Sequence, residues 1–83
     1  MNFNTYKIKF IANKEQILYI NSVLDSYEGI GIMRTIDKNK GLVCIYSTEI
    51  LHKQALAVLS ALKREGVMIE NITVEVSEDV DSW

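Results

Sequence analysis

Cys44 and His52 are the residues of this sequence best suited to act as a nucleophile and a base, and each is the single residue of its type. Catalysis by such a pair requires the base within hydrogen-bond reach of the thiol, which the spacing alone does not show. Because free cysteine is among the most often buried residues, we favour a packed thiol and a solvated histidine. No catalytic residue is assigned. The alternative is a small thiol-dependent enzyme in which His52 or Arg34 assists Cys44.

Metal, phosphate and nucleotide sites are not predicted. Structural zinc needs four ligands, and the chain has one cysteine and one histidine. Gly29 and Gly31 bracket a helix-to-strand junction and do not form a nucleotide-binding loop. The loop after the first predicted strand contains Asn13 and Lys14 but neither arginine nor glycine, which argues against phosphate chemistry there. We therefore expect no metal and no cofactor.

Length and composition predict one small domain over residues 1–83. Of its 83 residues, 48% are hydrophobic and 24% are charged, with a net charge of -2. This predicts one core over about residues 5–77, followed by an acidic tail at 78–83. The sequence has neither a long apolar span nor the residue order of a signal peptide. With a single cysteine, these features predict a cytoplasmic protein without a membrane association.

Alternating apolar and charged residues predict the first strand, and a helix-capping pattern predicts the start of the first helix. Residues 6–10 alternate apolar and charged side chains, which predicts a strand with Lys7 and Lys9 on the face opposite its apolar residues. Asn13 followed by Gln16 resembles a capping box and predicts the start of a first helix. The remaining elements are a C-cap at Gly29, a strand over 30–36, a turn over 37–41, a strand over 42–47, a second helix capped by Ser47 or Thr48 and ended by Gly66, and a strand over 69–77.

This order, β-α-β-β-α-β, predicts an α+β protein with a ferredoxin-like fold. Right-handed crossovers place both helices on one face of a four-stranded antiparallel sheet. The first and third strands are then central, and the second and fourth lie at the edges.

Two short segments carry a resemblance to a known family, namely Tyr27-Glu28-Gly29-Ile30 and Arg34-Thr35-Ile36-Asp37. A turn to Gly41 and a leucine-rich second helix follow them. In these features the chain resembles, over about residues 6–76, the short bacterial proteins grouped as domain of unknown function 4911. The resemblance implies a small bacterial cytoplasmic protein of no established activity, and it supplies no catalytic residues.

In strand order alone the chain also resembles ACT domains, which are regulatory modules that bind amino acids. Those domains use a glycine-containing loop between the first strand and helix. Here that loop reads Ile11-Ala-Asn-Lys14 and has no glycine. The wider resemblance therefore implies the order of strands and helices. It does not imply an amino-acid ligand, because the loop lacks the glycine.

Residues 30–36 and 42–46 are apolar on both faces, although a sheet covered on one side should leave its other side polar. A contiguous exposed apolar patch marks an interface, and an edge strand also offers unpaired backbone groups. We therefore predict a homodimer, formed sheet on sheet or by edge pairing. The candidate interface residues are Lys7, Lys9, Ile30, Ile32, Arg34 and Ile36.

Arg34, Thr35 and Asp37 are polar residues near the end of this otherwise apolar strand. They form a candidate contact site for a small ligand or a partner protein. The alternative, which we favour, makes Asp37 the acceptor for the backbone of its own turn and Arg34 a solvent-facing residue.

RNA binding is a further alternative, because domains of this topology stack bases on aromatic residues of the two central strands. At most one such aromatic residue faces outward here, and a net charge of -2 supplies no basic field. The sequence therefore predicts a non-catalytic binding or regulatory module that self-associates through its sheet. We expect no nucleic-acid partner.

Overall fold

The computed structural model describes residues 4–27 and 29–77. The elements are β1 (Thr5–Ala12), the 3-10 helix η1 (Lys14–Gln16), α1 (Ile17–Asp25), β2 (Ile32–Asp37), β3 (Leu42–Thr48), α2 (His52–Arg64) and β4 (Ile69–Ser77). The predicted acidic tail at 78–83 lies outside the described residues.

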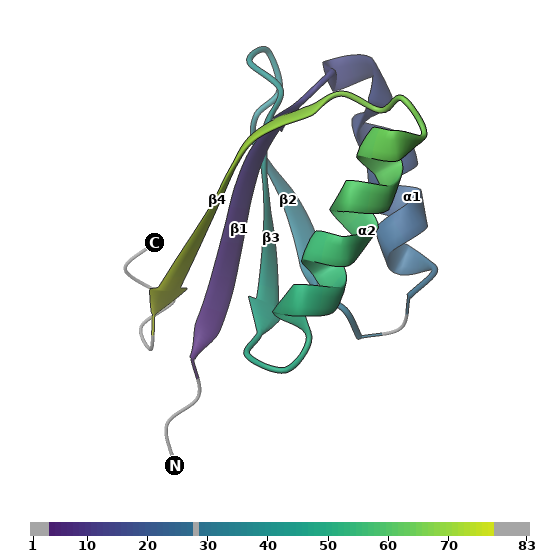
Figure 1. Ribbon diagram of the computed structural model, residues 1–83. Helices are drawn as coiled ribbons and strands as arrows, with labels where there is room; N and C mark the ends of the chain where they lie inside the picture. The colour runs from purple at the N-terminus through teal and green to yellow at the C-terminus, as the bar shows by residue number, and fades with distance from the viewer. Residues whose placement is uncertain (1–3, 28, 78–83) are drawn as a thin grey trace.

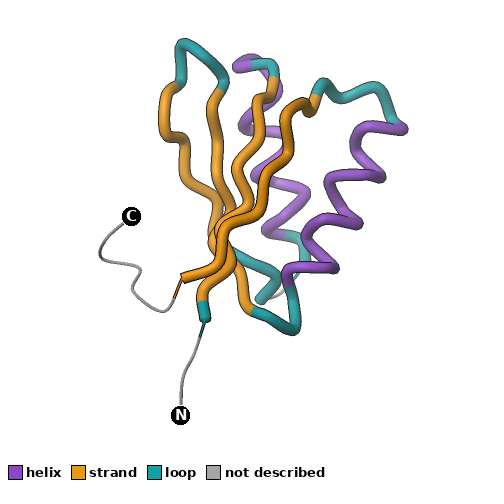
Figure 2. Tube along the Cα trace, turned by 60° about the vertical axis from the view of Figure 1, so that its left-hand side comes forward, coloured by secondary structure: helices purple, strands orange, loops and turns teal. Residues whose placement is uncertain are grey.

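The four strands form one antiparallel sheet in the order β2-β3-β1-β4. Both helices lie on the same side of this sheet (Figures 1 and 2). The predicted ferredoxin-like α+β fold is therefore confirmed, with β1 and β3 central and β2 and β4 at the edges.

The core lies between the sheet and the two helices, and alternation along the central strands explains why. In β1 every second residue from Ile8 to Ala12 is buried, and in β3 Val43 and Ile45 point to the same side. The helices cover them with apolar residues at helical spacing, namely Ile17, Ile20 and Leu24 of α1 and Ala55, Val58, Leu59 and Leu62 of α2.

The start of the first helix differs from the prediction. Asn13 does cap this start, since its Oδ1 accepts a hydrogen bond from the backbone N–H of Glu15 at 3.0 Å. Gln16, however, does not reach back to complete a capping box. Its Oε1 accepts a hydrogen bond from the backbone N–H of Met68 at 3.4 Å, which ties η1 to the segment entering β4. The capping-box prediction is thus wrong for Gln16, because a tertiary partner is within its reach.

The second helix ends as the sequence predicts. Gly66 has φ of 100°, its N–H donates to Lys63 O at 3.0 Å, and the N–H of Val67 donates to Leu62 O at 3.0 Å. These two hydrogen bonds form a Schellman motif, which satisfies the last carbonyls of α2. At the other end, Thr48 Oγ1 accepts from the backbone N–H of Leu51 at 3.1 Å.

Both edge strands are irregular. The pairing of β2 with β3 shifts between Thr35 and Asp37, and the pairing of β4 with β1 shifts opposite the stretch from Lys9 to Ile11. In β4 the irregularity contains Asn71, whose φ is 55°. Each shift is a β-bulge, which leaves only short regular stretches at the two edges.

Candidate functional site

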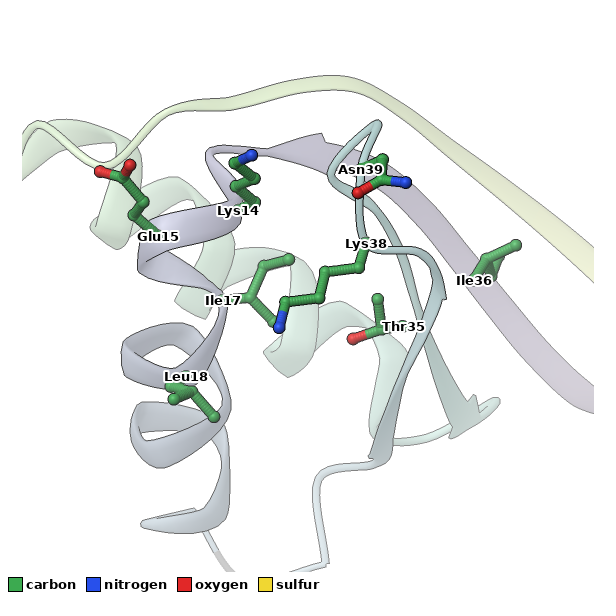
Figure 3. Close-up of a pocket in the computed structure, with 8 residues that line it drawn as sticks. All are labelled: Lys14, Glu15, Ile17, Leu18, Thr35, Ile36, Lys38 and Asn39. Atoms are coloured by element: carbon green, nitrogen blue, oxygen red, sulfur yellow. The ribbon is translucent and has the colours of Figure 1, made fainter.

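The sheet surface turned away from the helices, here called the open face, is one of two candidate sites. Because side chains alternate along a strand, the residues between the core positions point to this face. By strand register the open face contains Thr5, Lys7, Lys9, Ile11, Ile32, Arg34, Asp37, Leu42, Cys44, Tyr46, Thr48, Glu70, Thr73 and Glu75. Ile36 lies where the register shifts, between Thr35 and Asp37. Figure 3 shows its side chain on the side of β2 away from α1, and the residue also borders the groove described below.

Two apolar residues of β2 stand out on the open face. Ile32 is 70% exposed and Ile36 is 47% exposed, although both belong to a strand of the sheet. Half-buried Ile11, Leu42 and Tyr46 extend this apolar surface across β1 and β3. The open face therefore combines exposed apolar side chains with a half-buried apolar centre.

Ile30 is not part of the open face, and its predicted place beside Ile32 and Ile36 is wrong. The strand begins at Ile32 rather than at residue 30. Ile30 is 1% exposed in the helix-side core, and its carbonyl accepts a hydrogen bond from the Ser47 hydroxyl at 2.6 Å. Ser47 thus anchors the approach to β2. Thr48 stabilises the turn that leads into α2, whose N-cap residue is Leu51 rather than the predicted Ser47 or Thr48.

The cations of the open face differ in how freely they can meet another molecule. Lys7 is buried, with its ammonium 5.9 Å from the ring centroid of Tyr46. Lys9 forms an ion pair with Glu75 at 3.0 Å. Arg34 is exposed at the β2 edge. Of the three predicted interface cations, Arg34 is therefore the one best placed for an intermolecular contact.

Cys44 and His52 lie on opposite faces of the sheet. Cys44 is 0% exposed on the open face, in register with Lys9 and Arg34. His52 stacks on Tyr6 on the helix side, with ring centroids 4.0 Å apart, and its Nδ1 lies 2.7 Å from Glu49 O. The predicted packed thiol is confirmed, and the sheet separates it from the imidazole. The predicted solvated histidine is half-buried instead.

Tyr46 is the one aromatic residue that β1 and β3 place on the open face. A side-chain hydrogen bond with Cys44 raises the pKa of the Tyr46 phenol above its ordinary 10.0, and burial raises this pKa further. Tyr46 therefore stays neutral at physiological pH. A single ring, with Lys7 near it, does not form the stacking platform that RNA-recognition domains use.

Asp37 serves its own turn, as the favoured interpretation predicts. Its Oδ1 accepts from the backbone N–H groups of Asn39 at 3.0 Å and Lys40 at 3.2 Å. The predicted trio of polar residues is also divided, since Arg34 points to the open face and Thr35 points toward α1 (Figure 3). The structure therefore does not bring Arg34, Thr35 and Asp37 together as one site.

The second candidate site is a groove of about 810 Å³ between the start of the first helix and the β2–β3 hairpin (Figure 3). Its lining residues are Lys14, Glu15, Ile17, Leu18, Thr35, Ile36, Lys38 and Asn39. Of these, Thr35 is a predicted ligand contact and Ile36 a predicted interface residue. The one sequence signal for the groove is Leu18, a large apolar residue outside the buried stripe of α1.

Metal and membrane sites are not among these candidates. Within residues 4–27 and 29–77, no group of three or more histidine, cysteine, aspartate or glutamate side chains is placed to hold a metal ion. None of the helices in this part of the chain is long and apolar enough to cross a membrane.

Comparison with known proteins gives one match. A family model described as Domain of unknown function (DUF4911) matches residues 10–65, which run from β1 through α2. No curated protein and no solved structure matches the chain significantly. The predicted bacterial origin, cytoplasmic location and likeness to ACT domains stay predictions.

Proposed function

The chain belongs to the family described as Domain of unknown function (DUF4911), and this description gives no activity. We therefore propose a function from the geometry of the structure alone. The protein is a non-catalytic module that binds a second copy of itself through the open face. The observation that carries the proposal is the exposure of Ile32. This side chain is 70% exposed, and it lies beside the half-buried apolar centre of the open face.

Burial of the open face would remove apolar surface from water, which is the main driving force for association. Ile32 and Ile36 lie at the β2 side of the face, and Leu42 and Tyr46 continue the apolar surface toward the centre. Singly exposed apolar residues are common on monomers, whereas a contiguous group of this kind is typical of an interface.

Charge favours a second copy as the occupant. Arg34 is exposed on the β2 edge, and Glu70 is exposed on the β4 edge of the same face. Among the described residues neither forms an ion pair, since the one pair there joins Lys9 and Glu75. A two-fold axis parallel to the strands would place β2 of one copy over β4 of the other. By strand register Arg34 would then lie at the level of Thr73 of the second copy, one open-face position from Glu70 and one from Glu75, twice in each dimer.

The test is the solution mass by light scattering over a wide range of protein concentration, for the wild type and for Ile32→Glu. We expect a dimer for the wild type and a monomer for Ile32→Glu, because a buried carboxylate without a partner opposes association. Ile50→Glu is the matched control. Ile50 is exposed in the loop before α2, away from the open face, so this variant should remain dimeric.

Two outcomes would overturn the proposal. One is a wild-type monomer at the highest concentration, which would assign the open face to a different partner protein. The other is a dimer that Ile32→Glu and Arg34→Glu both leave intact. Circular dichroism on each variant separates lost association from lost folding.

A further inference from the structure

The groove between the first helix and the β2–β3 hairpin has an apolar wall that the core does not explain. Ile17 forms part of its floor and is largely buried. Leu18, the next residue, is 81% exposed at the side of the groove. An exposed leucine beside a concave surface offers apolar contact to a molecule that enters the groove.

The groove also contains two ammonium groups from different elements. Lys14 extends from η1 with its ammonium directed away from Ile17, and Lys38 extends from the hairpin with its side chain directed toward Ile17 (Figure 3). In residues 4–27 and 29–77 the one ion pair is between Lys9 and Glu75, so neither groove lysine is neutralised there.

Two acidic residues lie near these lysines, Glu15 in the lining itself and Asp37 at the start of the hairpin turn. Figure 3 shows the carboxylate of Glu15 on the side of η1 away from the hairpin. Asp37, at the start of the hairpin turn, uses its Oδ1 for the N–H groups of Asn39 and Lys40. The lining is therefore apolar along one wall and positively charged at Lys14 and Lys38.

Hydrogen bonds hold the two walls in place relative to one another. The backbone N–H of Ala12, just before η1, donates to Gly41 O at the base of the hairpin at 2.8 Å. Asn13 fixes the first turn of η1, and Asp37 fixes the turn of the hairpin. The groove is therefore formed before any ligand binds, which reduces the entropy lost on binding.

From this arrangement we propose that the groove binds a small organic carboxylate with an apolar body. The carboxylate pairs with Lys38, Lys14 adds a second positive charge at the end of the groove, and the apolar body lies along Ile17 and Leu18. The volume of about 810 Å³ falls within the range of small-molecule sites, about 300 to 1,000 Å³. A carboxylate fits better than a phosphate, since the lining has neither an arginine fork nor a glycine-rich nest of N–H groups. The proposal does not depend on self-association through the open face.

The test is a titration of the ¹⁵N-labelled protein, followed by amide chemical shifts. The probes are octanoate, octan-1-ol, octylammonium and inorganic phosphate. We expect saturable shifts with octanoate at Lys14, Leu18, Thr35 and Lys38, at least tenfold weaker binding of octan-1-ol, and no binding of octylammonium or phosphate at these residues.

Two double variants test the role of the lysines. Lys14→Gln with Lys38→Gln should weaken octanoate binding at least tenfold. Lys53→Gln with Lys63→Gln removes the same charge from exposed positions of α2 and should leave binding unchanged. All four residues are exposed, so each protein should keep its folded spectrum.

The proposal is overturned if octanoate gives no saturable shift at the groove, or if its shifts fall on the open face instead. If octan-1-ol binds as tightly as octanoate, the groove does not recognise the carboxylate charge. The same conclusion follows if the affinity for octanoate is unchanged after Lys14 and Lys38 are replaced. If phosphate binds as tightly as octanoate, contact with the apolar wall does not contribute to binding. Dimer formation in the light-scattering experiment is a separate result, so failure of one proposal leaves the other standing.

Discussion

At the scale of single residues, Gly41 sets the position of the β2–β3 hairpin against β1. Its φ is 71°, and a Cβ at this position would overlap the carbonyl oxygen of Ala12. The backbone N–H of Ala12 donates to Gly41 O at 2.8 Å, which requires this close approach. The wall of the groove therefore depends on the absence of a side chain.

Gly41→Ala should lower the free energy of unfolding by about 3 kcal/mol or more, because a strained φ and a steric overlap add together. Gly66→Ala is the matched control. Gly66 also has a positive φ, of 100°, but a Cβ there would meet no atom within 4 Å. This control should lose only about 1 to 2 kcal/mol, the expense of the left-handed conformation itself. Urea unfolding measures the stability of both variants. Equal losses would contradict the steric overlap of a residue-41 Cβ with the carbonyl oxygen of Ala12.

At the scale of elements, the sequence was most informative where local chemistry decides the structure. Asp37 and Gly66 act as the turn acceptor and helix end that their residue types favour, and Thr48 accepts a hydrogen bond in the turn that leads into α2. Gln16 and Ile30 were placed wrongly for a physical reason. Gln16 bonds to the distant Met68, and Ile30 is held in the core by Ser47. Neither partner is near in the sequence, so local patterns could not reveal them.

The hydrogen bond of Thr48 before α2 is testable as an element-scale contribution. Thr48→Val keeps the β-branched shape but removes the oxygen that accepts from the N–H of Leu51. We expect the free energy of unfolding to fall by about 1 kcal/mol, the usual net contribution of one hydrogen bond. Ser60→Ala removes an exposed hydroxyl within α2 itself and should be neutral or slightly stabilising. Thermal unfolding compares the two, and an unchanged stability in Thr48→Val would show that this hydrogen bond contributes nothing.

At the scale of the whole molecule, the order of elements was enough to predict the sheet. It was not enough to predict the groove, which combines residues from η1, α1 and the hairpin. Lys14 and Lys38 lie far apart in the sequence and have no pattern in common. Both line the groove because the strand order brings the end of β1 to the base of the hairpin.

Hydrogen exchange distinguishes the two ways in which copies could associate. The central strands β1 and β3 should exchange most slowly at any concentration, since both neighbours protect their amides. For association through the open face, the outward amides of β2 should exchange equally fast at low and high protein concentration. Slower exchange of these amides at high concentration would instead indicate that β2 pairs edge to edge with a second chain.

The bulges in both edge strands bear on what happens when many copies are crowded together. Open-ended stacking into fibrils requires long, flat strand edges that accept one chain after another. Here β2 pairs regularly only from Ile32 to Thr35, and β4 is interrupted at Asn71. Neither edge offers such a template. An exposed apolar face can therefore favour an assembly that closes after two copies, while the irregular edges act against an amyloid-like polymer.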